Sequence, residues 1–207
     1  MSGLLLKDWY VMKKNCRIYV WMVLIFLIIS LMGDSNTFFA FYPCFICSVL
    51  PVNLLSFDEN SRWHQYSAAL PYTREQIVSA KYLIGLLSLA ALMLLTAGAQ
   101  SVRVAAGVFS GERLAALLMM MLTMSLFATA ICLPFVFRFG VERGRAAYFV
   151  TVGFVCAASV LASNVLDDSM MAEVRAGFPL IAVSLASVGL YALSWYLSIK
   201  FYKKREL

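Results

Sequence analysis

The sequence predicts an all-α integral membrane protein with six transmembrane helices, and three observations lead to this fold class. Hydrophobic residues occupy 62% of the 207 positions and charged residues only 14%, whereas soluble domains carry about 45–50% apolar and about 25% charged residues. Six apolar stretches approach the roughly 20 residues that a membrane-spanning helix needs. Lys and Arg gather in the segments on one side of these stretches. A soluble enzyme, a disulfide-rich secreted domain and a disordered chain are therefore excluded.

The expected spans fill most of the chain, so residues 1–207 are interpreted as a single transmembrane domain. The spans cover residues 18–32, 37–55, 82–99, 114–137, 146–166 and 177–199. None of them carries an ionisable side chain in its interior, whereas ion-driven transporters commonly use carboxylates or histidines there. Direct coupling to an ion gradient is therefore not expected. Three spans contain a proline, which is compatible with a functional hinge or with a simple bend, and these prolines are Pro43, Pro51, Pro134 and Pro179.

The distribution of basic residues predicts the orientation of the chain. The N-terminus, the loop 56–81, the turn 138–145 and the C-terminal tail together hold 14 Lys and Arg residues, and the connections on the other side hold 3. Such an excess is typical of cytoplasmic segments, so both termini are expected in the cytoplasm. No small-x-small cleavage site follows the first span, which is therefore expected to remain as an anchor.

Residues 2–17 predict an amphipathic helix that lies in the membrane interface. Its apolar positions recur at helical spacing, and they are Leu4, Leu5, Trp9, Met12 and Cys16. Trp9 and Tyr10 would lie at the depth of the lipid headgroups. The alternative is a solvated basic tail, for which the leucines and the Trp–Tyr pair would have no use.

The longest hydrophilic stretch, residues 56–81, predicts a short helix across the cytoplasmic face. Asp58 and Glu59 are acidic residues of the kind that favour a helix N-terminus, and they are expected to be exposed. One stripe of the helix would carry Trp63, Tyr66 and Leu70. Pro71 would end it, because the residue before a proline is pushed out of the helical region.

After this helix, Thr73 and Gln76 have the spacing of a capping box and predict the start of a second helix that runs into the third span. The aromatic stripe of the first helix has two interpretations. Trp63 and Tyr66 either dock a cytosolic partner, since aromatic residues and Arg commonly carry interface energy, or pack back on the protein's own spans.

Motifs for catalysis or cofactor binding are missing from the sequence. There is no phosphate-binding G-x-x-x-x-G-K-[ST] loop, and a single histidine, His64, cannot supply a two-histidine metal site. Cys44 and Cys47 lie inside an apolar span, where such a pair is typical of packing. We therefore expect no catalytic residue, no metal and no cofactor on this chain. The net charge of +6 follows from membrane orientation, so no nucleic-acid partner is expected either.

Four motifs resemble one family of transporters. They are G-L-L-L-K-D at 3–8, D-E-N-S-R-W-H-Q-Y at 58–66, L-P-Y-T-R-E-Q-I-V at 70–78 and S-A-K-Y-L at 79–83. Together they resemble the small permease subunits of bacterial type-2 ABC exporters. The resemblance is closest to the permeases of phenol-soluble modulin exporters and of related peptide exporters.

The resemblance implies two permeases, identical or different, that assemble with two copies of a separate ATPase subunit, which would bind ATP and Mg. It also implies an interfacial elbow helix, matched by residues 2–17, and a coupling helix between the second and third spans. Expected contacts with the ATPase are Asp58, Glu59, Arg62, Trp63, Tyr66, Leu70, Pro71 and Arg74.

The implied function is ATP-driven export across a bacterial cytoplasmic membrane. A pathway without charges suits an amphipathic or apolar cargo, which by the resemblance would be a peptide, or else a lipid-like molecule. The alternative is a membrane immunity or scaffold protein without a transport cycle. Small residues four apart, such as Gly153 with Ala157 or Ala158 with Ala162, would let helices of two permeases approach closely.

Overall fold

The computed structural model describes residues 2–31, 37–61, 73–107, 110–141 and 178–204, with single positions between them. Every regular element in these ranges is a helix, which fits an all-α membrane protein. The helices are α1 (Ser2–Asn15), α2 (Arg17–Leu31), α3 (Thr37–Asn60), α5 (Arg74–Ala105), α6 (Gly111–Phe139) and α9 (Phe178–Lys204). The expected fifth span, 146–166, lies mostly outside the described residues.

Three of the described helices are long and apolar enough to cross a membrane. They are Arg74–Ala105, Gly111–Phe139 and Ala182–Lys203. The segments Gly3–Asn15 and Arg17–Leu31 meet this condition only as a pair, and a bend of 69° separates them. The described part of the chain therefore holds up to four spans by length and composition, of the six that the sequence predicts.

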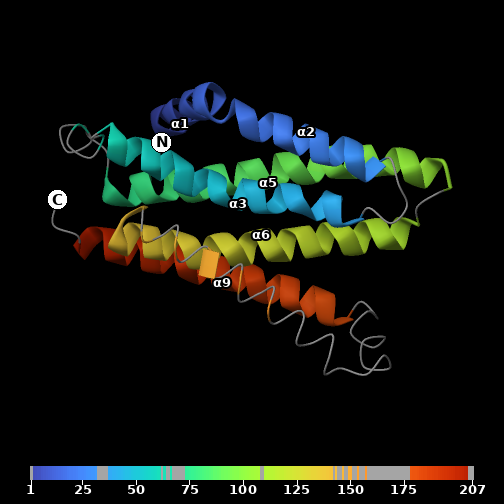
Figure 1. The fold of residues 1–207 in the computed structure, drawn as a ribbon. Coiled ribbons are helices and arrows are strands. Elements are labelled where there is room, and N and C mark those ends of the chain that lie inside the picture. Colours follow the sequence, from blue (N-terminus) through green and yellow to red (C-terminus); the bar gives the residue numbers. More distant parts are fainter. Residues whose placement is uncertain are drawn as a thin grey trace.

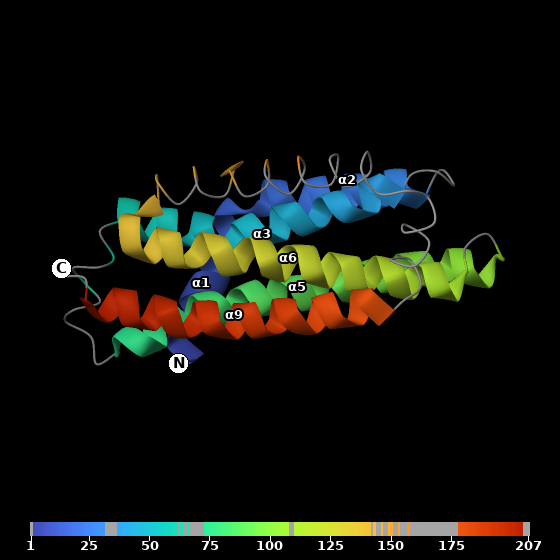
Figure 2. The same ribbon diagram turned by 90° about the horizontal axis from the view of Figure 1, so that it is seen from below.

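The helices run side by side as an elongated bundle, and α1 lies across it (Figures 1 and 2). In the bundle α6 packs against α9 and α3, while α5 contacts α3, α6 and α9. The N-terminal part of α1, the C-terminal end of α3, the N-terminal end of α5, and the C-terminal ends of α6 and α9 all lie toward the same end of the bundle (Figure 1). The segments that carry most of the Lys and Arg residues are therefore gathered at one end, as the sequence predicts.

Helix α5 begins where the capping box predicts. The Thr73 hydroxyl accepts a hydrogen bond from the Gln76 backbone N–H at 3.3 Å, and the Gln76 side chain accepts one from the Thr73 N–H at 3.2 Å. Two of the otherwise unpaired N–H groups of a helix N-terminus are thereby satisfied. The capping box is confirmed, and it fixes where the chain turns back into the bundle.

Helix α3 extends further than the sequence predicts. It continues through the end of the expected span to Asn60, so Asp58 and Glu59 lie in its last turn rather than at the start of a new helix. The expected helix N-terminus at these residues is wrong. No Gly or Pro interrupts residues 52–60, so nothing in this segment stops the helix. An acidic residue at a helix C-terminus is unfavourable unless a cation offsets it, and Lys7 and Lys81 supply that charge to Asp58.

Polar and aromatic side chains join α5 to α9 in the interior. The Tyr82 hydroxyl lies 2.8 Å from the Ser194 hydroxyl and 2.7 Å from that of Ser198. The ring of Tyr82 stacks on Trp195, whose indole N–H donates to the Ser79 hydroxyl at 3.1 Å. Because buried hydroxyl groups are costly unless they are hydrogen-bonded, this network fixes the register between the two helices.

Candidate coupling site at the basic end of the bundle

Four charged side chains meet at the basic end of the bundle. The Lys81 ammonium donates to both carboxylate oxygens of Asp8 at 2.8 Å and lies 2.6 Å from an Asp58 oxygen. The Lys7 ammonium donates to the other Asp58 oxygen at 2.7 Å and lies 3.2 Å from Asp8. We call these four residues the charge cluster. Its two lysines and two aspartates balance each other.

Three members of the charge cluster are almost completely removed from solvent. The side chains of Asp8, Lys81 and Asp58 are 2%, 3% and 8% exposed, whereas that of Lys7 is 23% exposed. Burying a charge is costly, and mutual attraction offsets the cost only where the geometry is good and the remaining polar atoms are hydrogen-bonded. Each buried member has at least two oppositely charged contacts, so the cluster meets this requirement.

The charge cluster connects segments that are distant in the sequence. Lys7 and Asp8 belong to α1, Asp58 to the end of α3, and Lys81 to the beginning of α5. The Lys7 ammonium also lies 4.1 Å from the centre of the Trp63 ring, in cation–π geometry. The segment after α3 is therefore held to α1, and α1 in turn is held to α5.

The structure corrects the expected exposure of the acidic pair. The sequence predicts Asp58 at the surface, but its carboxylate is buried and forms ion pairs with Lys7 and Lys81 of the same chain. Glu59 is half-buried, and its carboxylate accepts a hydrogen bond from the Val141 backbone N–H at 3.4 Å. Asp58 is thus placed to position neighbouring elements of this chain.

The two aromatic residues of the predicted docking stripe, Trp63 and Tyr66, lie in different environments. Trp63 packs against the main hydrophobic core, the cluster of buried residues that includes Leu4, Val78 and Leu133. This is what the second interpretation of the stripe expects for Trp63. Tyr66 is helical and 67% exposed. Arg74 is exposed, and its guanidinium donates to the Lys203 carbonyl oxygen at 3.0 Å. Arg62, Leu70 and Pro71 lie outside the described residues.

The helix predicted for residues 2–17 is present as α1, and the chain turns by 69° into α2 at Cys16. Leu4 is buried in the main core, and Leu5 and Met12 are half-buried. Trp9 and Tyr10 are exposed, at 58% and 62%. An exposed Trp–Tyr pair fits a helix at the membrane surface, and its place there stays a prediction.

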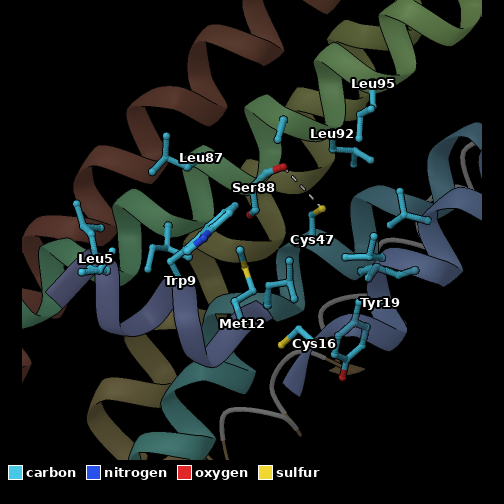
Figure 3. Close-up of a pocket in the computed structure, with 17 residues that line it drawn as sticks. Leu5, Trp9, Met12, Cys16, Tyr19, Cys47, Leu87, Ser88, Leu92 and Leu95 are labelled. Carbon is cyan, nitrogen blue, oxygen red and sulfur yellow. Dashed lines mark hydrogen bonds between the residues drawn. The ribbon is translucent and has the colours of Figure 1, made fainter. Parts of the chain in front are cut away.

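We call the bend between α1 and α2 the elbow, and its inner side forms an apolar groove. A cavity of about 750 Å³ lies between α1, α2, α3 and α5, and its lining includes the predicted stripe residues Leu5, Trp9, Met12 and Cys16 (Figure 3). The Trp9 indole extends across the groove toward α5 (Figure 3). Part of the stripe that the sequence assigns to the lipid interface therefore faces a hollow in the protein.

The described residues hold no group of side chains that could bind a metal ion. No three His, Cys, Asp or Glu side chains converge on a possible metal position in this part of the chain. Cys16, Cys44, Cys47 and Cys132 are buried thiols that form no disulfide, and burial raises the pKa of the Cys16 thiol. A buried thiol with a raised pKa is a poor nucleophile and metal ligand at neutral pH.

Sequence reasoning missed Lys7, Asp8 and Lys81 as parts of a site. A signal for Asp8 was present, because it follows Leu4 by four and Leu5 by three positions and so lies on the apolar face of α1. An acidic residue on a buried face needs a buried cation. Lys81 directly precedes the expected third span, but nothing in the sequence links it to Asp8, 73 residues away.

A bundle of long apolar helices with its cationic segments at one end defines a multi-pass membrane protein, and the site at that end holds no catalytic set among the described residues. Residues 3–203, nearly the entire chain, match the family described as ABC-2 family transporter protein. The chain therefore belongs to this family and is a permease component of an ABC transporter. Membership generally implies an ABC ATPase as partner. No curated protein and no solved structure matches the chain.

Proposed function

We propose that this chain is the transmembrane subunit of an ATP-driven exporter and couples hydrolysis on a separate ATPase subunit to movement of its own helices. ATP and Mg would be bound by the ATPase, and this chain would carry no enzymatic activity. The observation that supports the proposal is the charge cluster, which joins the segment after α3 to α1 and α5. A displacement of that segment would reach both helices through ion pairs.

The basic end of the bundle is proposed to face the cytoplasm, in agreement with the excess of Lys and Arg there. Both termini and the segment between α3 and α5 would then lie on the side of the ATPase. In this orientation α1 would lie in the cytoplasmic membrane interface, and its exposed Trp9 and Tyr10 would reach the headgroups.

The proposed contact surface for the ATPase is centred on Tyr66, because this aromatic residue of the segment is exposed. The remaining proposed contacts are Glu59, Arg62, Leu70, Pro71 and Arg74. Asp58 and Trp63 take a different role in this proposal. They would transmit the displacement, since both contact Lys7 within the chain.

The complete exporter is proposed to contain two permeases and two ATPase subunits. Gly153 and Ala157 are helical and exposed, and a Cβ added at Gly153 would have no atom within 4 Å. Such small exposed residues four apart would allow a second permease to approach closely. The cargo is proposed to be an amphipathic or apolar molecule, with a peptide as the first candidate because of the sequence resemblance.

The proposal is tested by co-purification of this chain with a candidate ABC ATPase subunit from the same organism. Tyr66→Ala is compared with Tyr196→Ala, because the two tyrosines are equally exposed, at 67% and 66%, but Tyr196 lies on α9. Loss of an aromatic anchor at an interface costs about 2–4 kcal/mol. We expect Tyr66→Ala to weaken ATPase binding at least about tenfold and to reduce cargo-stimulated hydrolysis, while Tyr196→Ala retains both. Normal ATPase binding and export by Tyr66→Ala would contradict the proposed contact surface.

A further inference from the structure

The groove inside the elbow has the shape of a site for a hydrocarbon chain. On α5 its lining residues recur along one face, and they are Ile84, Leu87, Ser88, Ala91, Leu92 and Leu95. At 1.5 Å of rise per residue, this stripe is about 16 Å long. A cavity of about 750 Å³ that is open along one side can accommodate an extended chain of such length (Figure 3).

The polar groups that line the deeper part of the groove are already hydrogen-bonded within the protein. The Ser88 hydroxyl donates to the Gly85 carbonyl oxygen at 2.9 Å, and the Ser88 carbonyl oxygen accepts a weak bond from the Cys47 thiol at 3.9 Å. The Tyr19 hydroxyl accepts from the Asn53 amide at 2.9 Å. A polar ligand would find few partners there, so the part of a ligand that enters the groove is apolar.

Three positive charges lie beside the groove at the elbow. Lys13, Lys14 and Arg17 are exposed, and they flank Met12 and Cys16, which line the groove. None of the three forms an ion pair with any acidic residue in the described ranges, and the nearest acid along the chain, Asp8, is held by Lys81. Arg17 donates its Nε–H to the Lys13 carbonyl oxygen at 3.1 Å, which leaves the terminal guanidinium nitrogens for a ligand.

We propose that the elbow groove binds an anionic phospholipid, with an acyl chain along α5 and its phosphate at Lys13, Lys14 and Arg17. The apolar lining and the adjacent exposed cations together match an anionic lipid better than a neutral one. The inference rests on the proposed function only in placing α1 at the membrane surface. A bound lipid would fill the space between α1 and α5 and thereby support the 69° bend.

The test uses the full-length permease, purified in detergent without the ATPase. Phosphatidylglycerol or phosphatidylcholine with identical acyl chains is added at equal concentrations, and bound lipid is counted by native mass spectrometry. We expect phosphatidylglycerol to remain bound at lower concentrations than phosphatidylcholine. Because no ATPase is present, this result is independent of whether Tyr66 contacts that subunit.

Two pairs of variants locate the lipid. Ala91→Phe places a ring in the groove, whereas Ala90→Phe adds the same ring at an exposed neighbouring position outside it. We expect only Ala91→Phe to abolish lipid retention. Lys13→Gln with Lys14→Gln is expected to lower the preference for phosphatidylglycerol by about fivefold for each lysine, while Lys200→Gln on α9 leaves it unchanged. The lysine variants alter exposed residues, so they keep the test valid if Ala91→Phe fails to fold.

Three results would overturn the inference. Equal retention of the two lipids would exclude selection by charge, and equal effects of Ala90→Phe and Ala91→Phe would exclude the groove as the site. Displacement of both lipids alike by an amphipathic peptide, with no preference for phosphatidylglycerol, would assign the groove to cargo.

Discussion

The Lys81 ammonium lies 2.8 Å from both carboxylate oxygens of Asp8, and both side chains are almost completely buried. This ion pair attaches α1, which lies across the bundle, to the first turns of α5, a helix long enough to span the membrane. A buried pair of this kind is sensitive to the loss of either partner, because the other is then left as an uncompensated charge.

Lys81→Met is expected to destabilise the protein strongly. Asp8 and Asp58 would then share only Lys7, and breaking a buried ion pair costs about 3–5 kcal/mol. Thermal unfolding in detergent, followed by circular dichroism, should show a lower midpoint. Lys200→Met, which removes an exposed lysine of α9, should leave the midpoint nearly unchanged.

A second change at Asp8 should partly rescue the Lys81→Met variant. Asp8→Leu with Lys81→Met leaves Lys7 and Asp58 as a balanced pair, so the double variant should be more stable than Lys81→Met alone. Coupled residues deviate from additivity in this way. If the two changes simply add, the four charges do not act as one cluster.

Two glycines of α5 should respond oppositely to alanine. A Cβ at Gly85 would lie 3.2 Å from the Pro51 ring of α3 and 3.5 Å from the Tyr191 hydroxyl, whereas no atom lies within 4 Å of one at Gly98. Gly85→Ala is expected to cost about 1–3 kcal/mol by overpacking. Gly98→Ala should be neutral or stabilising by up to about 1 kcal/mol, since Ala favours helix over Gly. The thermal unfolding midpoint of each variant is compared with that of the wild type. A Gly85→Ala variant more stable than the wild type would show that the Pro51 ring moves to accommodate the added methyl group.

The orientation of the chain can be read by cysteine labelling. Ser61 and Ser110 are exposed; Ser61 directly follows α3 and Ser110 directly precedes α6. The C-terminal end of α3 and the N-terminal end of α6 lie at opposite ends of the bundle (Figure 1). In intact cells, a membrane-impermeant maleimide is expected to label Ser110→Cys and to leave Ser61→Cys unlabelled until the membrane is permeabilised. The four described native cysteines are buried, which keeps the background low. Labelling of Ser61→Cys in intact cells would reverse the proposed orientation.

Tyr82→Phe tests the polar network between α5 and α9. The change removes the hydroxyl shared with Ser194 and Ser198 but retains the ring that stacks on Trp195. Leaving two buried serine hydroxyls without this partner should cost about 1–3 kcal/mol. The matched variant Tyr196→Phe removes an exposed hydroxyl of α9 and should have little effect on the unfolding midpoint. Equal midpoints for the two variants would show that the network contributes little.

The sequence was most informative where structure depends on near neighbours. Helical spacing predicted α1, and the Thr73–Gln76 pair predicted the start of α5, because both signals act within four residues. The predicted end of α3 is wrong because the residues next to Asp58 in the sequence do not show which charges stabilise it. Its stabilising partners lie on α1 and α5, and such distant pairings leave no periodic signal.

In the candidate site, too, features that depend on neighbouring residues could be predicted and contacts between distant residues could not. Exposure of Tyr66 fits the predicted docking stripe, since an aromatic residue in a polar segment is visible in the sequence. The contact of Trp63 with Lys7 was not predictable, because it depends on where α1 is placed by the bend at Cys16. The packing of the helices determines that Trp63 contacts the core while Tyr66 is exposed.

The charge cluster also sets an order for the biogenesis of the protein. Helix α1 leaves the ribosome before α5, and Lys81, the main partner of Asp8, is synthesised 73 residues after it. We therefore expect Asp8 to remain hydrated until the beginning of α5 has emerged. Helix α1 is thus made early but held in place late, because its attachment needs Asp58 at the end of α3 and Lys81 at the beginning of α5.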